Sequence, residues 1–123
     1  MRGNAKELTQ EQLSAVLTAR EQRKEAKRIE RLAAWGRLIE AETKAKQVPG
    51  WKVGELLRAV AQRAGKSTNA ICIAKSPVYY GDNSPATLNK IADKYLELAA
   101  EKQAENELRI IANSGNSISE QNT

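Results

Sequence analysis

The chain of 123 residues contains no histidine, no phenylalanine and a single cysteine, Cys72. Zinc sites of thiolates or imidazoles, Cys-His pairs and Ser-His-Asp triads all need residues that this chain lacks, so these sites are excluded. One cysteine also cannot build a disulfide framework. We therefore expect a protein that is not an enzyme and that works with no cofactor and no metal.

Long hydrophobic runs are absent as well. Nothing near the first residue has the pattern of a signal peptide, and no segment approaches the roughly 20 apolar residues of a membrane span. The carboxylates show no paired arrangement in an apolar setting, which general acid–base catalysis would need. The sequence predicts a cytoplasmic protein with no membrane contact and no small-molecule substrate.

What the chain does have is positive charge, distributed unevenly. The formal net charge is +5, made up of +4 in residues 1–50, +3 in residues 51–99 and −2 in residues 100–123. An excess of lysine and arginine attracts anionic partners such as nucleic acid. We expect such a contact in the first four fifths of the chain.

Local signals predict an all-α fold that begins with a long charged helix. Thr9 and Gln12 form a capping box, and Val48-Pro49-Gly50 should end the helix. The apolar positions of this segment fall into two clusters separated by the polar residues 20–28. The segment is therefore either two helical units or one helix with an exposed middle.

The next predicted helices follow from apolar spacing and turn residues. An amphipathic face repeats from Val53 to Ala64, and Gly65 suits the position after a helix end. Ser67 can cap a short helix over residues 68–75, which Ser76-Pro77 should end. The face comprises Val53, Leu56, Leu57, Val60, Ala61 and Ala64.

A last helix should begin at Ser84-Pro85, with serine as its N-cap and proline as its first residue. Its apolar face continues thinly to Leu108 and Ile111, and the Gly, Asn and Ser of residues 113–117 should end it. No strand is expected. The predicted organisation is a basic helical extension with the first helix at 1–50, a core at 51–99, a helical extension and association surface at 100–111, and a disordered tail at 112–123.

Residues 53–99 resemble a known family. The segments Val60-Ala61-x3-Gly65-x-Ser67-Thr68-x2-Ile71, Tyr80-Gly81-Asp82-Asn83 and Ser84-Pro85-x-Thr87-Leu88-x2-Ile91-Ala92 are similar to the helix-turn-helix and following helix of lambda-repressor-like domains. The Tyr-Gly-Asp-Asn element also resembles the N-terminal domain of the phage Mu target-selection ATPase. Lys66 departs from the family pattern, because an aliphatic residue usually follows the turn glycine.

The resemblance implies that residues 68–75 form a recognition helix for the major groove of DNA. Asn69 could form two hydrogen bonds with an adenine, and Ile73 could contact a thymine methyl group. Basic residues around the helix would position phosphates. The implied groove-facing residues are Ser67, Thr68, Asn69, Cys72, Ile73 and Ser76, and the implied phosphate contacts are Arg58, Arg63, Lys66 and Lys75.

Each of these residues also has a simpler interpretation. Ser67 could serve only as an N-cap, and Asn69 could point into water. Cys72 and Ile73 could complete a core or a dimer contact, because cysteine and isoleucine are often buried.

The stretch from Arg20 to Arg31 is a second candidate contact with nucleic acid. In a helix, its basic residues form like-charge pairs four residues apart, each destabilising by about 0.2–0.5 kcal/mol, which phosphate groups would relieve. The alternative is a solvated helix face neutralised by its glutamates. The residues singled out for DNA contact are Lys24, Lys27 and Arg28.

A phosphate-binding loop is the remaining motif, suggested by Gly65-Lys66-Ser67-Thr68. The full motif requires a glycine where this chain has Val60, and it must follow a strand instead of an amphipathic helix. We therefore reject nucleotide binding.

Together these features favour a transcription regulator of the phage or mobile-element type that binds double-stranded DNA as a homodimer. A single recognition helix reads only a few base pairs, so useful specificity needs two copies. The alternative is a non-enzymatic adaptor or nucleoprotein assembly protein, such as an antitoxin or accessory factor, that binds mainly a protein partner.

Overall fold

The computed structural model describes residues 9–122, and the side chains of residues 9–113. Residues 1–8 of the predicted N-terminal extension, and Thr123, lie outside the described residues. The all-α prediction is confirmed across the described range, which contains no strand. The elements are α2 (Gln10–Gln47), α3 (Glu55–Ala64), α4 (Thr68–Lys75), the 3-10 helix η1 (Tyr80–Asp82) and α5 (Pro85–Asn122).

Helix α2 is one continuous helix with an exposed middle. The predicted capping box is present: Thr9 Oγ1 accepts from the N–H of Gln12 at 3.1 Å, and Gln12 Oε1 accepts from the N–H of Thr9 at 3.0 Å. The helix ends at Val48, whose backbone is extended ahead of the proline. Both predicted ends of this helix are therefore confirmed.

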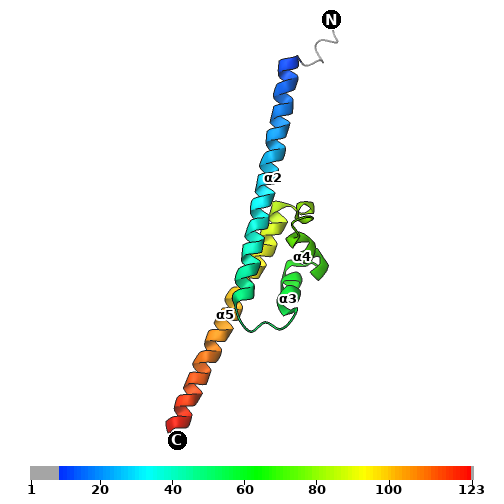
Figure 1. Cartoon of the computed structure of the whole chain (residues 1–123). Helices are drawn as coiled ribbons and strands as arrows, with labels where there is room; N and C mark the ends of the chain where they lie inside the picture. The colour runs from blue at the N-terminus through cyan, green and yellow to red at the C-terminus, as the bar shows by residue number, and fades with distance from the viewer. Residues whose placement is uncertain (1–8, 123) are drawn as a thin grey trace.

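The core forms where α2 and α5 lie side by side and run in the same direction (Figure 1). The contacting residues of α2 recur at a heptad spacing, which keeps them on one face of the helix. Three of these four residues are alanines, which lets the two helices approach closely, and the largest buried side chain opposite them is Tyr95. We call this set of α2 residues the core seam: Ala34, Leu38, Ala41 and Ala45.

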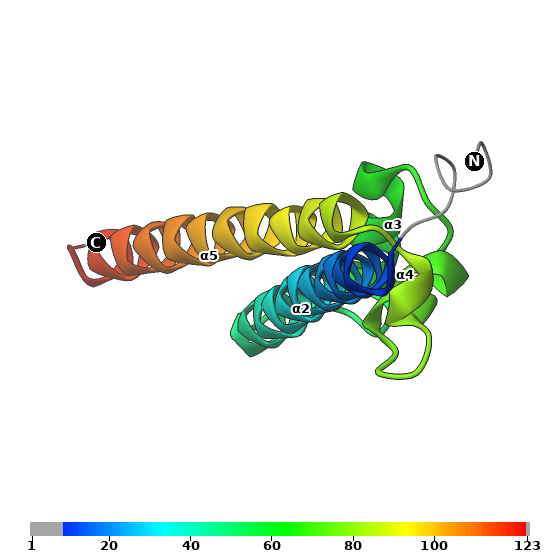
Figure 2. The same cartoon turned by 90° about the horizontal axis from the view of Figure 1, so that it is seen from above.

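Helices α3 and α4 cover one side of the α2–α5 pair (Figure 2). The predicted apolar face of α3 is confirmed by the burial of Leu56, Val60, Ala61 and Ala64. Val53 is an exception at 99% exposed, because α3 begins only at Glu55, so Val53 precedes the helix.

Both long helices extend beyond the core. The first half of α2 leaves the globular part at one end, and the last part of α5 leaves at the opposite end (Figure 1). Residues 20–30 and residues 107–113 are all exposed. We call residues 10–31 of α2 the N-terminal arm.

The predicted end of α5 is wrong. The helix continues through residues 113–117 to Asn122, so residues 112–122 are helical where a disordered tail was expected. Glycine, asparagine and serine each lower helix stability by up to about 1 kcal/mol, but unlike proline they keep the backbone N–H that extends the helix. Across the described residues, no helix is both long and apolar enough to cross a bilayer.

Candidate nucleic-acid interface

The turn between α3 and α4 is built from the residues that the sequence singled out. Gly65 adopts a left-handed conformation with φ 67°, which glycine tolerates without steric cost. The N–H of Lys66 then donates to the carbonyl of Ala61 at 2.9 Å, which closes the end of α3. Ser67 Oγ accepts from the N–H of Ala70 at 3.1 Å and caps α4.

Helix α4 has a buried face and an outer face. Ile71 and Ala74 are fully buried and hold the helix against the core. The side chains on the opposite face are exposed, including the polar groups of its first turn. Cys72 and Ile73 are exposed, so the alternative that they complete the core is wrong. The outer face comprises Ser67, Thr68, Asn69, Cys72 and Ile73.

Ser76 has a different position from these residues. It is half-buried, and its Oγ accepts from the N–H groups of Val78 and Tyr79 at 3.2 and 3.3 Å. Its hydroxyl oxygen therefore shapes the chain after α4.

The structure turns Lys75 inward. Its Nζ pairs with the carboxylate of Glu42 on α2, and the two side chains are 21% and 13% exposed. The backbone carbonyl of Lys75 accepts from Trp35 Nε1 at 2.9 Å. Lys75, predicted as a phosphate contact, thus forms an internal ion pair that attaches the end of α4 to α2.

Tyr95 of α5 completes this cluster, with its hydroxyl donating to Glu42 Oε2 at 3.4 Å. Burial and then the negative charge of Glu42 raise the pKa of Tyr95 well above its ordinary value. The sequence patterns do not identify this contact between Tyr95 and Glu42. No local motif links residues that lie 53 positions apart.

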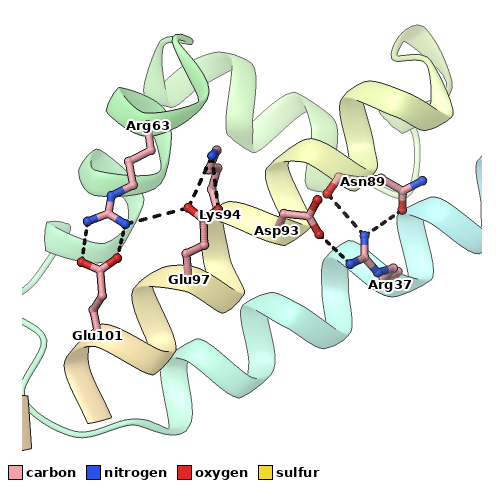
Figure 3. Close-up of polar contacts among 7 residues, drawn as sticks. All are labelled: Arg37, Arg63, Asn89, Asp93, Lys94, Glu97 and Glu101. Carbon is pink, nitrogen blue, oxygen red and sulfur yellow. Dashed lines mark hydrogen bonds and ion pairs between the residues drawn. The ribbon is translucent and has the colours of Figure 1, made fainter. Parts of the chain in front are cut away.

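Arg63 also has an internal partner. Its guanidinium donates two hydrogen bonds to the carboxylate of Glu101 on α5, and one nitrogen lies 3.9 Å from Glu97 Oε2 (Figure 3). The hydrogen bond from Arg63 is the main reason why the pKa of Glu101 is lowered. By contrast, Arg58 and Lys66 are exposed and make no ion pair with other described residues.

The basic residues of the N-terminal arm gather on one side of α2. At about 100° per residue, their side chains fall within an arc of about 140°. This arc is centred close to the direction of the core seam, so the side of α2 that packs on α5 becomes basic beyond the core. We call this surface the basic face: Arg20, Arg23, Lys24, Lys27, Arg28 and Arg31.

Two arginines of the basic face differ from the others. Arg28 donates two hydrogen bonds to Glu25 at 3.0 and 2.6 Å, so part of its charge is already balanced. Arg31 is half-buried, and its Nε is shielded from solvent without a hydrogen-bond partner among the described residues. Shielded donors are normally satisfied, so the Nε of Arg31 is an exception.

The chain has no match among models of protein families, curated proteins or solved structures.

Proposed function

We propose that this protein binds duplex DNA through two surfaces, the basic face of α2 and the outer face of α4. The observation that carries the proposal is the basic face itself. Six basic side chains share one side of the N-terminal arm; five of them are exposed, and Arg31, next to the core, is half-buried. A line of positive charge at helical spacing suits phosphate groups, whose counterions are released on binding.

The exposed first turn of α4 supplies the groups for base recognition. Asn69 has the donor and acceptor that pair with adenine, and Thr68 can bond to a base edge or a phosphate. Ile73 can contact a thymine methyl group. We assign phosphate contacts to Lys24, Lys27, Arg28, Arg58 and Lys66, and we leave Arg63 and Lys75 out because both are engaged internally.

The resemblance to lambda-repressor-like domains supports a narrower form of the proposal, a transcription regulator of the phage type. Selection of bound sequences from a random duplex pool tests it. A recovered motif supports base reading by α4. DNA that is retained without enrichment of any sequence indicates binding to the DNA backbone alone. If no DNA is retained at low salt, DNA binding is contradicted and the alternative function, an adaptor that binds a protein partner, is favoured.

A pair of matched variants tests the basic face. Replacing Lys24 and Lys27 with glutamine should remove two phosphate contacts. The plot of log K against log salt should then be less steep, its slope smaller in magnitude by about 2. The control replaces Lys52 and Arg109, which are exposed outside both the basic face and α4, and removes the same charge. Affinity measured by fluorescence anisotropy at several salt concentrations should change little in the control. Equal losses in both variants would contradict a specific role for this face.

A further inference from the structure

A second face of α2 is apolar and uncovered. Ile29 is 54% exposed and Leu32 is 41% exposed, and both share a side of the helix with the exposed Gly36 and the half-buried Ile39. At about 100° per residue, this side points about 180° away from the core seam. We call it the outer stripe: Ile29, Leu32, Gly36 and Ile39.

Among the described residues, no packing contact requires glycine at position 36. It lies in the interior of a long helix, where glycine is less stable than alanine. A Cβ built at this position would meet nothing within 4 Å, so no described part of the chain approaches Gly36 closely. The hollow that it leaves between Leu32 and Ile39 would, however, let the backbone of another helix approach closely.

Charge makes the outer stripe different from the basic face. Glu25 pairs with Arg28 at one end of the stripe, and Glu40 lies 3.5 Å from Lys44 at the other. The border of the stripe is therefore balanced, and nothing here attracts an anionic polymer. An apolar surface with balanced edges suits a protein helix of similar character.

We propose that the outer stripe binds the same stripe of a second copy of this chain, with the two α2 helices antiparallel and crossing at Gly36. In this arrangement Leu32 of each copy meets Ile39 of the other, and Glu25 comes near Lys46. Such a contact is isologous, so one stripe serves both copies. A parallel pair would instead place Arg28 beside Arg28 and bring the two positively charged N-terminal arms together.

Sedimentation equilibrium of the full chain, without DNA, tests this interface. Because the stripe is short, we expect a dimer that dissociates in the micromolar range. Gly36→Leu fills the hollow and should weaken the dimer by at least about tenfold, since a side chain there separates the helices. Ala100→Leu, which adds the same side chain at an exposed site on α5, should leave association unchanged.

Gly36→Ala provides a second readout. Alanine is the better helix former and fits the open space, so the thermal midpoint of the monomer should rise by a few degrees while the dimer weakens. A wild-type chain that is monomeric at about 100 µM, far above a micromolar dissociation constant, overturns the proposal. So does a dimer that both Gly36 variants leave intact. If Gly36→Leu fails to fold, Leu32→Gln tests the same surface, and an unchanged dimer would again overturn it.

Discussion

Lys75 is the last residue of α4, and its ammonium group is directed to Glu42 instead of solvent. The Glu42 carboxylate also lies 3.7 Å from Lys46 and accepts from the Tyr95 hydroxyl. One carboxylate on α2 thus contacts side chains from α4 and α5. This contact fixes the end of the helix to which we assign base recognition.

Replacing Lys75 with methionine should therefore destabilise the fold. The variant leaves the mostly buried Glu42 without its nearest cation, which we expect to lower the free energy of unfolding by about 1–3 kcal/mol. Urea denaturation followed by circular dichroism measures the change. Combining it with Glu42→Gln should restore most of the loss. An equal loss in Lys66→Met, at an exposed lysine, would rule out this explanation.

At the scale of the element, the two halves of α2 differ in what supports them. Residues 34–45 hold the core seam, whereas residues 20–30 are exposed on every side. Isolated helices of this length are marginal in water. The N-terminal arm therefore depends on its own hydrogen bonds and on whatever it binds.

Hydrogen exchange should report this difference. In the free protein we expect backbone amides of residues 20–30 to exchange at least about 100-fold faster than those of residues 38–45. Binding of duplex DNA should slow exchange in the N-terminal arm and leave residues 107–113 unchanged. Uniform protection along α2 of the free protein would contradict an unsupported arm.

The local sequence predicted where most helices begin and end, but it did not predict which side chains form ion pairs between helices. Thr9, Ser67 and Gly65 act through hydrogen bonds within a few residues, so their roles could be predicted from neighbours alone. Lys75 and Arg63 find partners on other helices, which no local pattern specifies. The sequence therefore predicted the residues of the candidate DNA-binding surface, and the structure showed which of them form ion pairs within the chain.

At the scale of the whole molecule, alkaline pH should weaken the fold through Tyr95. Its pKa is raised in the folded state above the ordinary value of 10, mainly by burial. The unfolded chain therefore loses the phenol proton first. The stabilising contribution of Tyr95 is complete below pH 10 and is lost as the pH rises toward the folded pKa.

We expect the free energy of unfolding to fall by up to about 1.4 kcal/mol per pH unit above pH 10 from this residue. Urea midpoints measured between pH 9 and pH 11 for the wild type and Tyr95→Phe would isolate this contribution from that of the lysines. The variant should show the shallower decline. Parallel curves for the two proteins would remove Tyr95 as the cause.

The basic face and the outer stripe lie on different sides of the same helix, about 130° apart at about 100° per residue. In an antiparallel pair joined through the outer stripes, the two-fold axis is perpendicular to both helices, so both basic faces would incline toward the same side of the pair. The two N-terminal arms would extend in opposite directions from the crossing at Gly36. One duplex lying along that side would therefore meet positive charge at two separated places.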